Sequence, residues 1–454
     1  MSISPRCGRC AGALARIWYD GDRDGIRLSA GEEKQPEMRA TPAHRVVVTG
    51  MGAITPLGNT VAAFWDALCA GRSGVGLATQ YDITDFPYVI AAEVRDFDPR
   101  DYMDAKAARR MARFAQFAVA AAGEALRDSG LDLDRVDRSR VAVNIGTALG
   151  GTANVEEQVL SFVARGRKRV DAFYMPTFIY NMAACQVAMT YGLHGPTTTP
   201  VLACATGTYA IGEAARMVQR GDALVAICGG TDAGVTALNA MAFGVIGAIA
   251  PPGDDPARAV RPFDARRQGT AGGEGCGILV LEQLDHALAR GAPIYAELAG
   301  FGATEDAFHL TAPAPGGVYA ALAITRAIED AELAPEDVDH ISAHGTGTPL
   351  NDAAETAAIK RALGAHAYKV TVSAIKSMIG HTAGAAGALA VIGCIKSIVT
   401  GTVPPTINYE VPDPECDLDY VPNQARRQEV RVALANAFGF GGQNAVVLVK
   451  RFEE

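Results

Sequence analysis

Short runs of β-branched residues alternate with alanine-rich stretches along most of this 454-residue chain. The runs have the length of buried strands, and the alanine-rich stretches have the length and composition of helices. This alternation predicts an α/β sheet that is covered by helices on both faces. The clearest predicted strands lie in residues 45–50, 141–146, 223–230, 277–282, 370–376 and 445–450, and a predicted helix runs from Ala112 to Leu126 before a stop at Asp128-Ser-Gly130.

Two stretches far apart in the chain resemble each other. Cys204-Ala-Thr-Gly-Thr-Tyr and His381-Thr-Ala-Gly-Ala-Ala both put a chemically active side chain at the start of a small-residue helix, and the helices end near Gly221 and Gly401. This internal repeat predicts two half-domains that pack through these helices and bring Cys204 and His381 together. A chance match between two glycine- and alanine-rich stretches is the alternative.

Cys204 lies where an apolar strand end runs into the first of these helices. The unpaired backbone N–H groups and the dipole of a helix N-terminus favour a thiolate, so this position predicts a lowered thiol pKa and a nucleophilic cysteine. The small residues Ala205, Gly207 and Ala210 predict a close approach by another backbone segment. The alternative is a buried structural cysteine, which is common in intracellular proteins.

Three further segments carry polar or glycine-rich sequences at predicted strand ends. His344 precedes a Gly/Thr loop, Lys376 and His381 share one short segment, and Asn436–Asn444 is a glycine-rich loop with two aromatic residues. A single histidine is usually a satisfied core residue. Two histidines, a lysine and a cysteine at strand ends favour an active site, because α/β sheets build their sites at the carboxyl ends of strands.

Composition excludes several classes of function. The formal net charge of −9 argues against nucleic-acid binding, and the apolar run 382–395 is too short to span a bilayer. Nine cysteines at irregular spacing do not resemble a disulfide framework and indicate a reducing cytoplasm. Cys7 and Cys10 form an isolated pair without a second pair or a nearby histidine, so no metal site is expected.

Residues 1–44 mix Arg, Gly, Asp and Glu without any period, and we expect them to form a disordered extension outside the fold. Arg6, Arg9 and Arg16 stand in a stretch without acids, which leaves a targeting peptide as an alternative. A start at Met38 is another.

At these motifs the chain closely resembles a family, the β-ketoacyl-[acyl carrier protein] synthases of the type II elongating class, which belong to the thiolase superfamily. The resemblance covers residues 45–450. It rests on five motifs in family order: Val46-Val-Val-Thr-Gly-Met-Gly, Ala203-Cys-Ala-Thr-Gly, His344-Gly-Thr-Gly-Thr, Lys376-Ser-Met-Ile-Gly-His and Gly439-Phe-Gly-Gly. It implies a thiolase-like α/β fold of two duplicated halves, residues 45–295 and 296–454, in a layered α-β-α-β-α arrangement.

The resemblance also implies a mechanism and its residues. Cys204 accepts an acyl chain from acyl carrier protein, and the N–H groups of Cys204 and Phe440 form the oxyanion hole. His344 and His381 stabilise the enolate of malonyl-carrier protein as carbon dioxide leaves, and Lys376 supports them electrostatically. Phe440 acts as a gate, and the phosphopantetheine tunnel is lined by Thr311, Thr346 and Thr348. The family forms homodimers and needs no metal or redox cofactor.

Several positions depart from the family pattern or extend it. Thr270 replaces a phenylalanine that flanks the malonyl group, and Ala390 stands where a glutamate usually partners the lysine. Asp306 and His309 match a family segment, and we expect structural roles for both. Ala115 appears at the position of a larger residue at the floor of the acyl tunnel, which predicts room for long chains; a packing role is the alternative.

A cluster of basic residues predicts the docking surface for acidic carrier protein. Lys106, Arg109, Arg110 and Arg113 recur at helical spacing. An ordinary solvated helix face is the alternative.

Two other functions stay open beside fatty-acid elongation. The first is a ketosynthase of type II polyketide or other secondary metabolism, which uses the same chemistry. The second is a non-condensing partner subunit that binds acyl chains. Loss of the nucleophile marks such a subunit, and the presence of Cys204 argues against it.

Overall fold

The computed structural model describes residues 44–166 and 170–453, so the predicted N-terminal extension lies almost entirely outside the described residues. Within the described part, ten strands form one continuous mixed sheet. In spatial order the strands are β11 (Thr371–Ser373), β10 (His340–Ser342), β14 (Val432–Gly439), β15 (Gln443–Lys450), β9 (Ala296–Glu305), β1 (Val46–Ile54), β8 (Gly275–Gln283), β6 (Val225–Asp232), β4 (Val141–Gly146) and β5 (Thr197–Thr198).

The same strand order occurs twice in this sheet. The order β5-β4-β6-β8-β1 is repeated by β11-β10-β14-β15-β9, and in both copies the first three strands are parallel and the last two are antiparallel to their neighbours. A short antiparallel pairing of Val47 with Glu297 and of Val48 with Ala296 joins the two copies. The predicted duplication is therefore confirmed.

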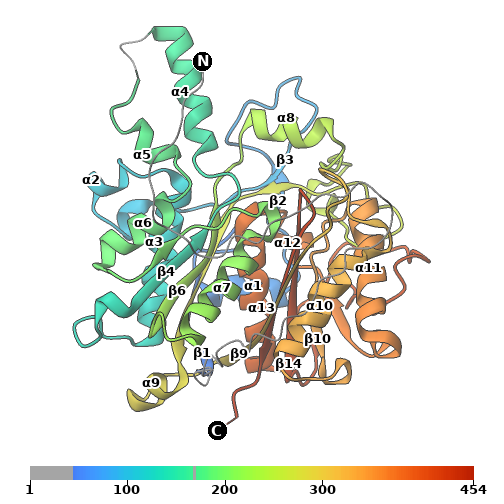
Figure 1. The fold of residues 1–454 in the computed structure, drawn as a ribbon. Helices are drawn as coiled ribbons and strands as arrows, with labels where there is room; N and C mark the ends of the chain where they lie inside the picture. Colours follow the sequence, from blue (N-terminus) through green and yellow to red (C-terminus); the bar gives the residue numbers. More distant parts are fainter. Residues whose placement is uncertain (1–43, 167–169, 454) are drawn as a thin grey trace, which may run out of the picture. The chain divides into compact units, whose positions relative to one another are not determined.

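Helices cover both faces of each copy. The α-helices of the described residues are α1 (Val61–Cys69), α2 (Ala105–Ala108), α3 (Arg113–Ser129), α4 (Thr152–Arg165), α5 (Tyr174–Phe178), α6 (Met182–Tyr191), α7 (Thr206–Gln219), α8 (Ala237–Val245), α9 (Leu284–Ala289), α10 (Val318–Asp330), α11 (Pro349–Leu363), α12 (Lys376–Ile379) and α13 (Ala386–Thr400). Helices α7 and α13 lie between the two half-sheets (Figure 1), α3 and α6 cover the outer face of the first copy, and α10 and α11 cover that of the second. The layers are thus α-β-α-β-α, as expected.

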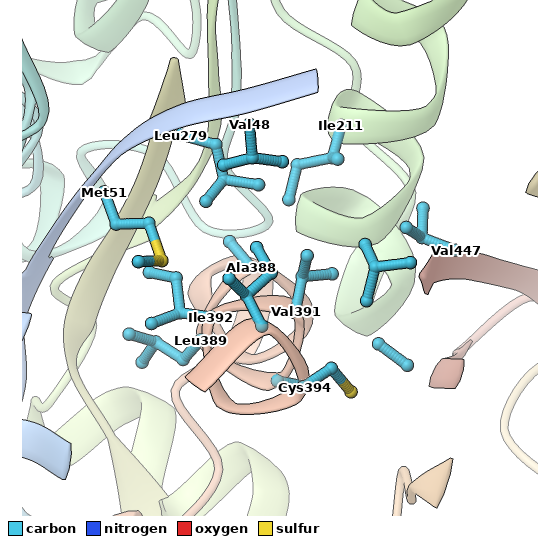
Figure 2. Packing of buried hydrophobic residues seen from close by; sticks show 14 of the residues in the cluster. Val48, Met51, Ile211, Leu279, Ala388, Leu389, Val391, Ile392, Cys394 and Val447 are labelled. Atoms are coloured by element: carbon cyan, nitrogen blue, oxygen red, sulfur yellow. The ribbon is translucent and has the colours of Figure 1, made fainter. Parts of the chain in front are cut away.

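Helix α13 is the centre of the largest core. Most of its residues are buried, as its nearly continuous apolar sequence predicts. In Figure 2 its side chains, among them Leu389 and Ile392, pack against Met51 and Leu279 from the first half-sheet. The helical stretch Ala383–Thr400 has the length and hydropathy of a membrane span, but 83% of it is buried inside the fold, so it is a core helix.

Glycines let the two central helices approach each other closely. A Cβ on Gly207 of α7 would lie 2.5 Å from the carbonyl oxygen of Gly384, which begins the approach to α13. Gly230 of β6 lies against the same carbonyl. The predicted close approach at Gly207 is therefore confirmed, and it fixes the distance between the two halves at the site.

Two small sheets complete the described fold. They are β2 (Val75–Leu77), β3 (Ile90–Ala92) and β7 (Gly272–Gly273), and β12 (Thr402–Val403) with β13 (Arg426–Arg427). The first of them reaches the active-site region, because the N–H of Gly273 donates to the carbonyl of His381 at 2.9 Å.

Candidate active site

Cys204 lies in a tight turn directly before α7. The turn Ala203–Ala205 has Ala203 in the left-handed region at φ 46°, and the N–H of Leu202 donates to Oγ1 of Thr206 at 2.8 Å. A Cβ on Gly439 at the end of β14 would lie 2.7 Å from the carbonyl oxygen of Leu202, so this glycine lets β14 approach the turn. The turn therefore holds Cys204 at the junction of the two halves.

His381 lies before an equivalent turn in the second half. The turn Ala383–Ala385 leads into α13, and Ala383 has a φ of 49°, close to that of Ala203. The N–H of Ala383 donates to Nδ1 of His381 at 3.2 Å. Because Nδ1 accepts this hydrogen bond, the proton of a neutral imidazole is on Nε2, which is free to donate to a substrate oxygen.

His344 and Lys376 form a buried pair beside it. His344 follows β10, and Nζ of Lys376 lies 2.6 Å from the backbone oxygen of His344 and 3.4 Å from its Nδ1. The ring centroids of His344 and His381 are 5.5 Å apart, with the ring planes nearly perpendicular at 81°. A protonated Lys376 makes Nδ1 of His344 an acceptor, so Nε2 of this ring is also a donor.

A cavity of about 380 Å³ brings most of the predicted site residues together. The predicted residues that line it are Cys204, Thr311, His344, Thr346, Thr348, His381 and Phe440. Lys376 is absent from the lining because it lies behind His344. The hydroxyls of Thr346 and Thr348 are 2.9 Å apart and present a polar patch on one wall. Residues from both halves thus converge on one space.

The thiol of Cys204 does not have the lowered pKa predicted from its helix start. Burial raises the pKa of Cys204 to about 11, although the charge of Lys376 and the N–H groups of Phe440 and Cys204 act to lower it. The side chain is partly accessible from the cavity, but protein surrounds it, and loss of hydration disfavours the thiolate more than the helix start favours it. At neutral pH the thiol of Cys204 is therefore protonated and uncharged.

The other titratable groups of the site are also shifted by burial. Burial and the charge of Lys376 lower the pKa of His381 to about 3, and the same causes hold the pKa of His344 well below its usual value. Burial lowers the pKa of Lys376 to about 8, while the nearby carboxylate of Glu355 acts to raise it. At neutral pH both imidazoles are neutral and Lys376 is mainly charged, which is the state needed for two Nε2–H donors.

Glu355 was missed from the sequence and lies behind the histidine pair. Its buried carboxylate accepts the N–H of His344 at 2.8 Å, the N–H of Gly345 at 2.7 Å and an amide proton of Asn436 at 3.1 Å. Ala390, where the resemblance implies a glutamate, is buried in the apolar core around α13. The acid that supports Lys376 here is therefore Glu355. The feature of the sequence that could have indicated this role is the position of Glu355, an acidic residue in the helix that follows the His344 loop.

The loop between β14 and β15 carries Phe440. Its ring is 36% exposed, its centroid lies 6.2 Å from that of Phe243, and the N–H of Gly441 donates to the carbonyl of Leu310 at 2.8 Å. The backbone N–H groups of Phe440 and Cys204 act to lower the pKa of the Cys204 thiol, so both lie close to its sulfur. The oxyanion hole that the resemblance implies for these two groups stays a prediction.

Asp306 and His309 hold the neighbouring loop. The carboxylate of Asp306 accepts the N–H of Ala314 and an amide proton of Asn444, both at 2.8 Å. Nδ1 of His309 lies 3.1 Å from the N–H groups of Thr311 and Ala312. These contacts fix the loop that brings Thr311 into the cavity.

A second, mainly apolar cavity meets the first. Four residues line both: Cys204, Phe243, Thr270 and His381. The hydroxyl of Thr270 has no hydrogen-bond partner among the described residues. Leu149, which follows β4 and precedes the Gly150-Gly151 turn, lines the second cavity only.

The structure does not bring Ala115 to either cavity. Ala115 is 1% exposed within α3, and α3 packs against the outer face of the first half-sheet. The expected helical position is correct, but this face of α3 points into the core. Leu149, which the sequence analysis did not single out, lines the second cavity instead.

Three of the four predicted basic residues form an exposed group, and Arg113 does not belong to it. Lys106, Arg109 and Arg110 are exposed at and after α2. Arg113 begins α3 and pairs with the buried carboxylate of Glu274 at 2.8 Å. The four residues do not share one helix, because the chain leaves α2 at Arg109.

In residues 44–166 and 170–453, no group of three or more His, Cys, Asp or Glu side chains is arranged to hold a metal ion. Cys7 and Cys10 lie outside the described residues.

Comparisons with known proteins show which family the chain belongs to. The chain matches two family models, the N-terminal domain of β-ketoacyl synthase over residues 43–287 and its C-terminal domain over residues 295–410. It is 48% identical over 409 residues to a 3-oxoacyl-[acyl-carrier-protein] synthase 2 of Synechocystis sp., covering 90% of this chain and 98% of that protein. It is 45% identical over 407 residues to the protein of the same name from Coxiella burnetii, with the same coverage of 90% and 98%.

Solved structures of similar fold include ketosynthases. One is a ketosynthase in complex with its type II polyketide acyl-carrier protein, with a TM-score of 0.84 and 33% identity, covering 90% of this chain and 100% of that chain. Another is the ishigamide ketosynthase/chain length factor, with a TM-score of 0.84, 38% identity and the same coverage. With these matches over most of its length, the chain belongs to the β-ketoacyl synthase family.

Proposed function

We propose that this protein is a 3-oxoacyl-[acyl-carrier-protein] synthase that lengthens acyl chains with malonyl-carrier protein in fatty-acid synthesis. The observation that carries the proposal is the convergence of Cys204, His344 and His381 on one cavity. Relatives with this name share 44–48% of their residues with the chain over nearly their whole length.

In the first half-reaction, Cys204 takes the acyl group from a carrier-protein thioester. A bond forms between Sγ and the acyl carbon, the bond to the carrier sulfur breaks, and the thiol proton ends on the carrier thiol. The N–H groups of Phe440 and Cys204, which act on the thiol, are the proposed donors to the oxyanion of this step. The high thiol pKa means that this proton must leave as the bond forms.

In the second half-reaction, malonyl-carrier protein loses carbon dioxide. The electron pair of the broken carbon–carbon bond moves onto the thioester oxygen as an enolate, and the Nε2–H groups of His344 and His381 stabilise it. The enolate carbon attacks the acyl-Cys204 carbonyl, and the sulfur leaves and regains a proton. Decarboxylation drives the step, so the reaction calls for no metal or redox cofactor.

The second cavity is the proposed site for the acyl chain on Cys204. Leu149, Phe243 and Ile249 contribute apolar side chains to it, and it begins at the nucleophile. Each buried methylene contributes roughly 0.8 kcal/mol, so an apolar space here selects a hydrocarbon chain.

Acyl carrier protein is the proposed partner, and Lys106, Arg109 and Arg110 are the proposed docking group.

We also propose a homodimer. None of the residues of α4 is buried, and Leu160 and Val163 are 64% and 78% exposed. Within the described residues, the exposed strand β5 pairs with β4 alone. Exposed apolar side chains on a helix and an open strand edge are features that an isologous dimer covers. The cytoplasmic location and the domain boundary at residue 295 stay predictions.

Polyketide synthesis is the second candidate, and two observations favour it. The similar solved ketosynthases include a polyketide enzyme. The hydroxyl of Thr270 lies at the junction of the two cavities and has no partner among the described residues, so its O–H can donate to a carbonyl oxygen on a bound chain.

One assay tests both candidates. Purified protein receives malonyl-carrier protein and either a saturated or a 3-oxoacyl primer on carrier protein, and mass spectrometry measures the extended product. Fatty-acid elongation predicts extension of the saturated primer with little use of the 3-oxo primer. Preferred extension of the 3-oxo primer supports the polyketide candidate, and absence of any extended product contradicts both.

A further inference from the structure

Asp232 is a buried carboxylate at the carboxyl end of β6, and it has no role in the chemistry above. It is 0% exposed. One oxygen accepts the hydroxyl of Thr147 at 2.5 Å and the N–H of Leu149 at 2.9 Å. The other oxygen accepts the N–H of Ala148 at 2.9 Å and the N–H of Gly384 at 2.6 Å. All four hydrogen bonds end on one ionisable group.

These donors belong to two different parts of the site. The 147–149 loop follows β4 in the first half and brings Leu149 into the second cavity. Gly384 belongs to the second half and lies in the turn after His381. Its neighbour Ala383 donates to Nδ1 of His381. Asp232 therefore binds Gly384, and the residue before Gly384 is Ala383, whose N–H orients the ring of His381.

The contact between Asp232 and the Ala383–Ala385 turn leaves the turn little room to move. A Cβ on Gly384 would lie 2.7 Å from the Asp232 carboxylate and 2.8 Å from the N–H nitrogen of Ala148. Only glycine fits between the two, so the turn rests directly on the carboxylate and on the first-half loop. Its position relative to Cys204 follows from this contact.

We propose that Asp232 is a positioning residue for decarboxylation, which fixes the Ala383–Ala385 turn so that Nε2–H of His381 points at the malonyl thioester oxygen. The proposal rests on the function proposed above. A carboxylate accepts all four hydrogen bonds, whereas an asparagine amide offers one oxygen and turns two donor hydrogens toward the remaining N–H groups. Asparagine at this position therefore leaves backbone donors unpaired and shifts the turn.

The same charge acts on the nucleophile in the opposite sense. The carboxylate of Asp232 raises the pKa of the Cys204 thiol, whereas Lys376 and the N–H groups of Phe440 and Cys204 lower it. Removal of the Asp232 charge should lower the thiol pKa and increase the thiolate fraction at a given pH. Loosened packing can also speed alkylation by exposing a buried thiol, so the labelling of Cys228, which is buried on the same strand as Asp232, is measured beside that of Cys204 as the reference.

The test is Asp232→Asn in the full chain, with two readouts. The first is carbon dioxide release from malonyl-carrier protein, where we expect kcat to fall about 10- to 100-fold with little change in KM, because a misplaced donor acts in the transition state. The second is alkylation of Cys204 by iodoacetamide at pH 8, where we expect a rate several-fold above wild type.

Two further variants separate positioning from stability. Glu282→Gln makes the same change in another buried carboxylate of the sheet, which is bound by Thr49, His286 and Arg290 away from the cavities. It should lower stability and leave both readouts unchanged in the folded protein. Thr147→Val removes one of the four hydrogen bonds and should give a smaller loss of kcat, which tests the proposal even where Asp232→Asn folds poorly.

The outcomes are distinct. Wild-type kcat in folded Asp232→Asn overturns the positioning role, and so does a parallel fall of both readouts. A wild-type protein that neither takes up an acyl group nor decarboxylates malonyl-carrier protein overturns the proposed function itself.

Discussion

Burial and positive charge act in opposite directions on the thiol of Cys204. The helix start and Lys376 favour the thiolate, but the surrounding protein removes hydration, and the pKa rises to about 11. At neutral pH the site thus contains an uncharged thiol next to two uncharged imidazoles. On the proposed function, charge develops when the substrate reacts, and the backbone N–H groups and the Nε2–H donors are proposed to stabilise it.

Alkylation of Cys204 should follow this pKa. We expect the rate with iodoacetamide to rise about tenfold per pH unit from pH 7 to pH 9, because the thiolate fraction rises tenfold per unit below the pKa. The measurement is peptide mass spectrometry of Cys204 against time at each pH, with free cysteine as the reference. A plateau below pH 8 would mean that the helix start dominates, as the sequence alone suggests.

At the scale of elements, the two central helices meet through glycine. Gly207→Ala puts a methyl group against the carbonyl of Gly384 and the N–H nitrogen of Ala388. We expect a loss of about 1–3 kcal/mol in the free energy of unfolding, because overpacked backbone contacts must separate. Urea denaturation measures the loss.

Gly393 provides the matched control within α13. A Cβ there meets no atom within 4 Å, so Gly393→Ala should be neutral or stabilise the protein by up to about 1 kcal/mol through helix propensity. Equal destabilisation by both variants would show that the close contact at Gly207 is not what limits the packing.

Some elements could be predicted from the sequence, and others could not. Strand β4 appears as a β-branched run over the residues predicted, and α3 ends at Gly130, which has a φ of 61°. Strands β9 and β14 were missed because alanine and glycine weaken the β signal in both, and pairing with β15 decides their conformation.

The same limit applies to the site. Cys204, His344 and His381 stand in recognisable motifs, whereas Asp232 and Leu149 reach the site only because β6 and β4 end beside each other. Their sequence neighbours carry no signal of that contact. The pKa of Cys204 was mispredicted for a related reason, because the burial of a group depends on tertiary packing.

At the scale of the whole molecule, the duplicated fold explains how one site uses both halves. The first copy supplies the nucleophile before α7, and the second supplies His381 before α13 at the equivalent turn. His344 and Lys376 come from the second copy alone. A carrier protein must therefore reach a cavity between the halves from outside, and surface charge should guide it.

Charge reversal tests this docking. Lys106→Glu with Arg109→Glu should raise KM for malonyl-carrier protein about tenfold at low salt, with kcat nearly unchanged, and the effect should shrink as salt rises. Arg135→Glu with Arg140→Glu is the matched control, since it changes the net charge equally and both exposed residues precede β4, while the site lies beyond the other end of that strand. Equal effects of the two changes would assign the loss to net charge alone.

The most direct test of the account is the mass of the protein during a single turnover. When the substrate is carrier protein loaded with an acyl group, and no malonyl-carrier protein is present, we expect the intact protein to gain the mass of one acyl group on Cys204. The Cys204→Ser variant should gain none. Addition of malonyl-carrier protein should then remove that mass and release a 3-oxoacyl product two carbons longer, together with carbon dioxide. An acyl group carried by another residue, or one that stays on Cys204 while malonyl-carrier protein is consumed, would contradict condensation at this site.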